Sequence, residues 1–168
     1  MNARAMLARQ LYALCLFALF ALSACAQTPT AAESLDRFPQ DTLTIATSDA
    51  RLHHFKIWIA AEERRQAQGL MFIKELAADR GMLFIYPTPR PIAMWMKNTY
   101  ISLDMLFIRA DGRVARVASD TKPLSLETIE SGEPVLAVLE LPAGTARHLN
   151  IRPGSLVMHA FFSGKLQR

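Results

Sequence analysis

A succession of short apolar segments, separated by turn residues, is the feature that most constrains how this chain can fold. Residues 42–47 and 55–59 alternate apolar and polar side chains with a period of two, which predicts two strands joined through a turn at residues 48–51. Residues 81–86 and 135–141 are continuous apolar runs of strand length, which is typical of buried strands. Many short strands predict a mostly β (α+β) protein: a small β-barrel-like or sandwich single domain with one or two short helices.

The dipeptide Asp111-Gly112 predicts the most clearly marked hairpin of the chain. It lies between the strand-like segments 101–110 and 113–118, and Asp-Gly favours the positive φ angles of a two-residue type I′ turn. Residues 61–68 are rich in helix-forming side chains, with acidic residues in the first turn, where the helix dipole favours them. We therefore expect one short helix in that segment.

Proline marks three further changes of direction. Three prolines within residues 87–91 predict a stiff turn, after which a new strand begins near Ile92. Residues 142–144 are expected to open a short helical turn, and the Pro-Gly pair at 153–154 turns the chain into its final segment, residues 155–162.

The first 25 residues have the organisation of a secretory signal peptide. Arg4 and Arg9 precede an apolar run over residues 11–22, which is shorter than the roughly 20 residues that a membrane-spanning helix needs. The segment ends in the sequence Leu-Ser-Ala-Cys, which resembles a bacterial lipobox in which Cys25 is acylated. The same stretch also fits an A-x-A cleavage site, which would release a soluble periplasmic protein, and the sequence leaves open whether the cut precedes Cys25 or follows Ala26.

Lipidation at Cys25 would make the membrane surface a partner of this protein, because several acyl chains hold a protein on a bilayer almost permanently. Ala26 rather than aspartate follows the cysteine, and by resemblance to Gram-negative lipoproteins this favours an outer-membrane lipoprotein that faces the periplasm. Residues 26–42 contain few large apolar side chains and predict a flexible tether. A single β-rich domain is then expected to cover residues 43–168.

Composition excludes several classes of protein. The chain has 168 residues, enough for one core, and both cysteines, Cys15 and Cys25, lie in the leader, so the domain is expected to contain no disulfide and no thiol nucleophile. The formal net charge of +4 becomes +2 without Arg4 and Arg9, which is no basic footprint for nucleic acid. Since no metal-ligand or nucleotide motif is present, we expect no metal and no other cofactor.

Six short motifs closely resemble those of one family of bacterial and archaeal proteins. They are Gly69-Leu70-Met71, Gly81-Met82-Leu83-Phe84, Trp95-Met96-Lys97-Asn98-Thr99, Leu103-Asp104, Asp111-Gly112-Arg113, and Val138-Leu139-Glu140-Leu141 with Ala143-Gly144. Over about residues 43–160 the chain resembles the domain-of-unknown-function family 192. The resemblance implies a compact β-barrel-like domain, often exported, with no established activity. The chain departs from the family pattern at Ile73, Ser102 and Ser155, where arginine, proline and aspartate are usual.

The motif from Trp95 to Thr99 is the first place to look for a binding site. It combines a planar apolar ring with hydrogen-bonding groups, the mixture that small-molecule and sugar sites use. Alternation along a strand would place Trp95, Lys97 and Thr99 on one face and Asn98 on the other. Packing in the core, with a turn at Asn98-Thr99, is the structural alternative.

Two acidic residues lie within otherwise apolar strands. Asp104 and Glu140 each need an ionic partner or hydrogen bonds, since an isolated buried carboxylate costs several kcal/mol. The structural interpretation of Asp104 is a pair with Lys97 or Arg65, or a carboxylate that accepts hydrogen bonds from loop amides. Alternatively, Asp104 and Glu140 could be the acid and base of a hydrolase if they lie about 5 to 10 Å apart.

These observations favour a non-catalytic module of the cell envelope that binds a small molecule, a glycan or an envelope protein. No catalytic residue is assigned; the candidate binding residues are Trp95, Lys97, Asn98, Thr99, Asp104 and Glu140. One alternative is a hydrolase of envelope polymers that uses Asp104 and Glu140. The other is a structural or chaperone-like partner of an envelope assembly, which would expose an apolar patch and have no pocket.

Overall fold

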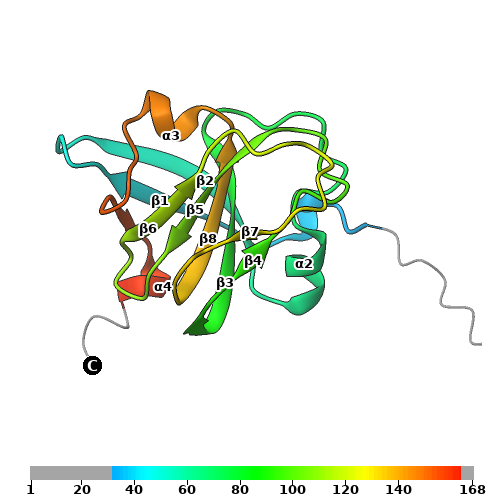
Figure 1. The fold of residues 1–168 in the computed structure, drawn as a ribbon, viewed down its shortest axis with the longest axis horizontal. Helices are drawn as coiled ribbons and strands as arrows, with labels where there is room; N and C mark the ends of the chain where they lie inside the picture. Colours follow the sequence, from blue (N-terminus) through cyan, green and yellow to red (C-terminus); the bar gives the residue numbers. More distant parts are fainter. Residues whose placement is uncertain (1–31, 164–168) are drawn as a thin grey trace, which may run out of the picture. The chain divides into compact units, whose positions relative to one another are not determined.

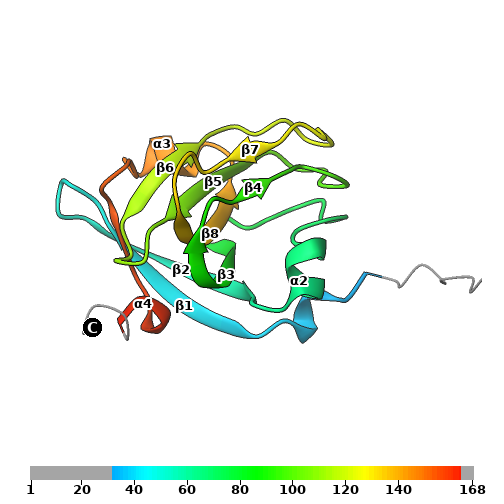
Figure 2. The same cartoon turned by 60° about the horizontal axis from the view of Figure 1, so that its bottom comes forward.

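Seven strands form one strongly curled sheet in the computed structural model, in the order β6-β5-β8-β3-β2-β1-β9 (Figures 1 and 2). The structure describes residues 32–163. The strands of the sheet are β1 (Gln40–Ala46), β2 (Leu52–Ala60), β3 (Arg80–Arg90), β5 (Leu103–Ile108), β6 (Val114–Ala118), β8 (Val135–Pro142) and β9 (Leu156–Met158). A separate two-stranded ribbon consists of β4 (Ala93–Met94) and β7 (Ile129–Glu130). The prediction of a mostly β single domain is confirmed.

Short helices connect these strands. They are the 3-10 helix η1 (Leu35–Arg37) and the α-helices α2 (Glu63–Gln68), α3 (Thr145–His148) and α4 (Ala160–Ser163). The sequence predicts α2 and the short helical turn that forms α3. It does not predict α4, which lies in the final segment after β9. Within residues 32–163, no helix is long and apolar enough to cross a membrane.

The sheet is antiparallel except at one pair of strands. β1 and β2 form the expected hairpin, but β2 and β3 run parallel, with Trp58 opposite Met82. A parallel pair needs a long crossover, and α2 lies within that connection. β3 also continues through the segment from Pro87 to Arg90, which the sequence predicted as a turn. The prolines lie where the ladder between β3 and β8 is interrupted, between Ile85 and Arg90, so that stretch needs fewer amide donors.

The hairpin between β5 and β6 is present, but its turn is not the predicted type. A type I′ turn requires a positive φ at both of its central residues. Gly112 has a φ of 80°, but Asp111 does not have a positive φ. The amide of Gly112 donates to the carbonyl of Arg109 at 3.0 Å, and the Oδ1 atom of Asp111 accepts from the amide of Arg113 at 2.9 Å. The hairpin therefore has a longer loop that ends in a left-handed glycine.

The folded unit begins earlier than the sequence predicts. Phe38 is 2% exposed, and β1 starts at Gln40, so the part of the expected tether from residue 32 to residue 42 is folded. The backbone of Glu33 exchanges two hydrogen bonds with the side chain of Gln68, at 2.6 and 2.7 Å, which fixes this segment to α2. The remaining residues of the expected tether, the signal segment and Cys25 lie outside the described residues.

Both faces of the sheet are covered. One apolar cluster contains Leu83, Leu106 and Leu139, and the other contains Phe84 and Phe107 from the opposite face of the same strands. The curled sheet is also joined at one end, because the short strand β9 pairs with β1 and meets the β5–β6 hairpin in a bridge between Arg113 and Leu156. The result is a half-barrel with a core on each side of its wall.

Candidate functional site

Glu140 is a buried acid whose carboxyl group has an unpaired oxygen. It lies in β8 directly opposite Met82 of β3 and Met105 of β5, and paired residues point to the same face of a sheet. Its side chain is 4% exposed, and its Oε2 atom has no hydrogen-bond partner in the described part of the chain. Burial raises the pKa of Glu140 to about 8, so this group is mostly protonated at neutral pH.

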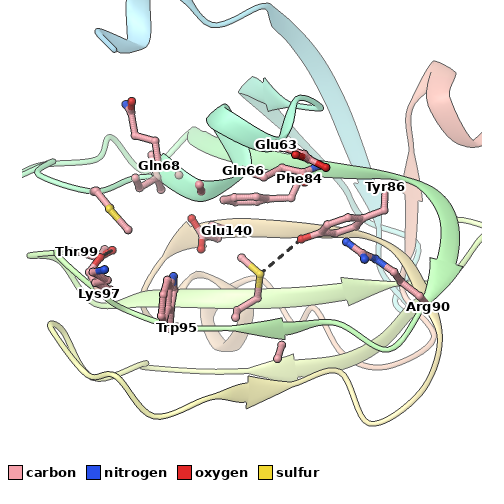
Figure 3. Close-up of a pocket in the computed structure, with 16 residues that line it drawn as sticks. Glu63, Gln66, Gln68, Phe84, Tyr86, Arg90, Trp95, Lys97, Thr99 and Glu140 are labelled. Carbon is pink, nitrogen blue, oxygen red and sulfur yellow. Dashed lines mark hydrogen bonds between the residues drawn. The ribbon is translucent and has the colours of Figure 1, made fainter. Parts of the chain in front are cut away.

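This carboxyl group forms part of the wall of a pocket of about 380 Å³ (Figure 3). The pocket lies between α2 on one side and β4 with the loop after it on the other. Its lining consists of Glu63, Gln66, Ala67, Gln68, Gly69, Leu70, Met71, Phe84, Tyr86, Arg90, Ala93, Met94, Trp95, Lys97, Thr99 and Glu140.

The α2 side of the pocket is held closely against β3. The helix ends at Gly69, which has a φ of 50°, and a Cβ atom there would lie 3.0 Å from the ring of Phe84. Glycine therefore allows the end of α2 to approach the aromatic wall of the pocket. The side-chain amide of Gln66 donates to the carbonyl of Ile85 at 2.7 Å, which fixes the middle of the helix to the same strand.

The opposite side of the pocket is the segment that follows β4. Met96 is fully buried and anchors this segment in the core, while the preceding Trp95 is 47% exposed. The Nζ atom of Lys97 lies 5.1 Å from the centroid of the Trp95 ring, and the hydroxyl of Thr99 donates to the carbonyl of Lys97 at 3.3 Å. Figure 3 shows these three pocket residues gathered at one end, with Glu140 between them and Phe84.

Tyr86 and Arg90 line the other end of the pocket in Figure 3. The guanidinium of Arg90 lies 5.1 Å from the centroid of the Tyr86 ring, and burial raises the pKa of Tyr86 to about 12. Lys97 thus lies at one end of the pocket, Arg90 lies with Glu63 at the other, and the carboxyl group of Glu140 between them is uncharged at neutral pH.

Asn98 and Asp104, the other two candidate residues, do not line this pocket. Asn98 has a φ of 55°, and its carbonyl accepts a hydrogen bond from the amide of Phe72 at 2.8 Å. Its backbone therefore forms the turn that the sequence analysis gave as the structural alternative.

Asp104 is fully buried and accepts hydrogen bonds from two backbone amides, those of Asp120 at 2.9 Å and Ala146 at 2.8 Å. It forms no salt bridge with Lys97, and Arg65 pairs with Glu33 and Glu62 instead. The interpretation as a carboxylate that binds loop amides is therefore the one that describes its contacts.

The proposed acid and base of a hydrolase do not face each other. Asp104 pairs with Leu141 in the ladder, one residue away from the pair of Met105 and Glu140. Because side chains alternate along a strand, Asp104 and Glu140 point to opposite faces of the sheet. Two carboxyl groups on opposite faces of a sheet cannot act on the same bond, so this geometry contradicts the hydrolase mechanism that the sequence suggested.

Sequence reasoning identified one wall of the pocket and missed the other. Gly69, Leu70 and Phe84 belong to motifs that carried the family resemblance, but nothing indicated that they meet Glu140. Tyr86 was predicted as part of a buried strand and Arg90 as part of a turn, so neither was marked as a site residue. Among residues 32–163, no group of three or more His, Cys, Asp and Glu side chains is placed to hold a metal ion.

The fold and the pocket define a small half-barrel protein with a buried carboxyl group, one oxygen of which is unpaired, in a ligand-sized pocket. The model of the domain-of-unknown-function family 192, described as an uncharacterized ACR, matches residues 44–159. The chain belongs to this family. No curated protein matches it.

The solved structures that are similar to this chain include two from bacteria. A putative transcription regulator from Sinorhizobium meliloti 1021 is 40% identical, with a TM-score of 0.73, and the match covers 74% of this chain and 96% of that one. A protein of unknown function from Novosphingobium aromaticivorans DSM 12444 is 33% identical, with a TM-score of 0.72, over 77% of this chain and 91% of that one.

Four of the motifs that carry the family resemblance meet in the pocket. The Gly69 motif contributes the end of α2, Phe84 closes the second motif, and the motif from Trp95 to Thr99 forms the opposite side. Glu140 comes from the last motif, in β8. Family motifs that are far apart in the sequence therefore line the same pocket.

Proposed function

We propose that this protein is an exported module of the cell envelope that binds a small polar ligand in the pocket lined by Glu140 and Trp95, and that it performs no catalysis. The observation that carries the proposal is the unpaired carboxyl oxygen of Glu140, because a buried polar group without a partner costs free energy. A ligand that hydrogen-bonds this carboxyl group would remove that cost. The volume of the pocket suits a small molecule.

The residues around Glu140 favour a particular kind of ligand. A protonated carboxyl group both donates and accepts a hydrogen bond, which matches a hydroxyl or amide group. The exposed ring of Trp95 offers a flat surface for stacking, as in many sugar sites. Lys97 favours an anionic substituent at its end of the pocket, whereas Glu63 accompanies Arg90 at the other end. We therefore propose a hydroxyl- or amide-bearing ligand, such as a sugar with an acidic group.

The location is part of the same proposal. The leader supports export, and the lipobox-like sequence supports acylation of Cys25 and attachment to the periplasmic face of the outer membrane. Labelling cells with radioactive palmitate tests this point. The label is expected on the wild-type protein and absent from a Cys25→Ser variant; an unlabelled wild type would mean a soluble periplasmic protein.

Nucleic acid is not the ligand that we propose, although one similar structure is described as a putative transcription regulator. Residues 32–163 carry 15 basic and 15 acidic side chains, so this part of the chain has no formal net charge. A protein that binds the phosphate backbone without sequence contacts depends on an excess of lysine and arginine.

Thermal unfolding of the folded unit, residues 32–168, tests the pocket. Envelope saccharides, acidic sugars, peptides and metal ions are added one class at a time. A ligand at 100 times its dissociation constant stabilises the folded state by about 2.7 kcal/mol, which is several degrees in a domain of this size. We expect acidic sugars to give the largest shift.

Three variants identify the site of the shift. Trp95→Ala and Glu140→Gln should reduce the shift, whereas Leu52→Ala should keep it, because Leu52 is 58% exposed and does not line the pocket. A shift that is equal in all three variants would place binding elsewhere. No shift with any class would contradict a small-molecule function.

A further inference from the structure

The described residues with large, exposed apolar side chains are concentrated on three neighbouring loops. Seven such residues are present, and five of them, Phe72, Trp95, Tyr100, Leu124 and Leu126, belong to the loops after α2, after β4 and after β6. Trp95 lines the pocket, and the other four do not. We call these four residues, Phe72, Tyr100, Leu124 and Leu126, the apolar tip. They are between 47% and 67% exposed.

Backbone hydrogen bonds join the three loops into one surface. The amide of Phe72 donates to the carbonyl of Asn98 at 2.8 Å, and the amide of Leu124 donates to the carbonyl of Thr99 at 3.1 Å. The rings of Phe72 and Tyr100 meet edge to face, with centroids 6.1 Å apart. The apolar tip is therefore a fixed structure and not a set of independent loops.

Two residues of the apolar tip are held in an unfavourable backbone conformation. Phe72 has a φ of 66° and Leu124 a φ of 61°, in the left-handed region that bulky side chains rarely adopt. Glycine or asparagine would fit these positions with less strain. Both side chains are about half exposed, so burial in a core does not offset this strain, and a surface contact outside the chain would.

The apolar tip lies at the end of the molecule where the described chain begins. Glu33 is hydrogen-bonded to Gln68, the amide of Met71 donates to the carbonyl of Gln68 at 3.1 Å, and Phe72 follows directly. Figures 1 and 2 both show η1, α2 and the three loops on one side, with the β1–β2 turn on the other. Six residues lie between Cys25 and Ala32, so the two are at most about 25 Å apart along a fully extended chain.

We propose that the apolar tip docks on the bilayer surface to which Cys25 anchors the protein. This inference rests on the proposed lipidation, since a lipid so close to Ala32 would keep this end of the folded unit near the membrane. Exposed aromatic and leucine side chains on protruding loops suit the interface between headgroups and acyl chains. The same loops carry three basic residues, Lys74, Lys97 and Lys122, and four acidic residues, Glu75, Asp79, Asp120 and Glu127. Apolar contact therefore supplies most of the binding.

The test uses the folded unit without its lipid, so that it does not depend on acylation or on the pocket ligand. Residues 32–168 are sedimented with vesicles of phosphatidylethanolamine and phosphatidylglycerol. The wild-type unit should co-sediment, with little dependence on salt. A variant with Leu124→Asn and Leu126→Ser should bind several-fold less.

Folding stability separates this inference from a structural role. Leu124→Asn should leave the melting temperature unchanged or raise it, because asparagine accepts the left-handed conformation, while vesicle binding falls. Leu52→Ser is the matched control: Leu52 is 58% exposed, similar to Leu124 at 56%, and lies near the β1–β2 turn. Its vesicle binding should equal that of the wild type.

Three results would overturn the inference. They are a wild-type unit that does not co-sediment, a tip variant that binds as well as the wild type, and a Leu52→Ser variant that loses as much binding as the tip variant. Concentration-dependent association that the tip variant abolishes, without vesicle binding, would make the apolar tip an interface between protein chains.

Discussion

Asp104 and Glu140 show how two acids in similar sequence surroundings acquire different roles. Both lie in strands in which every neighbouring residue is apolar, and both are less than 5% exposed. On the face of Asp104, the amides of Asp120 and Ala146 are available and satisfy the carboxylate. On the face of Glu140 no such donor is present among the described residues, and a pocket opens instead.

The environment of Glu140 makes the stability of the protein depend on pH. The pKa of this group is raised to about 8 in the folded state, whereas the unfolded chain has an ordinary value near 4.5. Between these two values the folded state holds a proton that the unfolded state has released, so stability falls as the pH rises from about 4.5 to about 8. The loss amounts to a few kcal/mol and is complete above pH 8.

Glu140→Gln tests this dependence. Glutamine has a similar shape and no ionisable group, so urea unfolding of the variant should lose the decline between pH 5 and pH 8. The wild type and the variant should differ most at pH 8, where the variant is the more stable. Parallel curves for the two proteins would show that Glu140 is not the responsible group.

At the scale of elements, periodicity was sufficient to predict most strands but not how they end. The alternating segments became β1 and β2, and the apolar runs became β3 and β8. The turn at Gly112 was assigned the wrong type, because a dipeptide does not show where pairing stops. The expected tether to residue 42 was too long, because the burial of Phe38 depends on a contact with α2 that composition does not reveal.

The candidate site was predictable only in part, because the sequence does not show which distant strands lie side by side. Trp95, Lys97 and Thr99 are neighbours in the sequence, so one motif brings them together. Glu140 meets them only through strand order, since β8 lies between β3 and β5 in the sheet. Pairing of distant strands is decided by the packing of the whole chain, and local pattern carries no information about it.

The carboxylate of Asp104 in β5 binds the loop after β6 and the helix α3, and its replacement should weaken both attachments. Asp104→Asn retains one acceptor oxygen and loses the other, so one of the two buried amides is left without a partner. The expected cost is about 1 to 3 kcal/mol in urea unfolding. Amide exchange of Ala146 in α3 or of Asp120 should rise at the same time; unchanged exchange at both would contradict the role described for this carboxylate.

At the scale of the whole molecule, the three-residue strand β9 joins the two ends of the sheet. Val157 is 1% exposed, pairs with Ile45 of β1, and donates its amide to the carbonyl of Gly112 at 2.8 Å. Gly112 suits this contact, because a Cβ atom there would lie 2.7 Å from the carbonyl oxygen of Val157. Three residues of β9 thus hold both ends of the curled sheet together.

Val157→Ala should therefore destabilise the whole domain. Removing two buried methyl groups and leaving a cavity costs about 2 kcal/mol. The neighbouring Met158→Ala is the control, because Met158 lies in the same strand but is 40% exposed, and its substitution should cost much less. Equal effects of the two substitutions on the unfolding midpoint would mean that β9 does not contribute through its buried side chain.

The position of β9 in the chain also decides when folding can finish. The first strand of the sheet has to wait for the last, since β1 is covered on its outer edge only after residues 156–158 have been synthesised. The half-barrel can therefore close only after nearly all of residues 32–163 are present, and until then the growing chain has an open sheet edge that can pair with another chain.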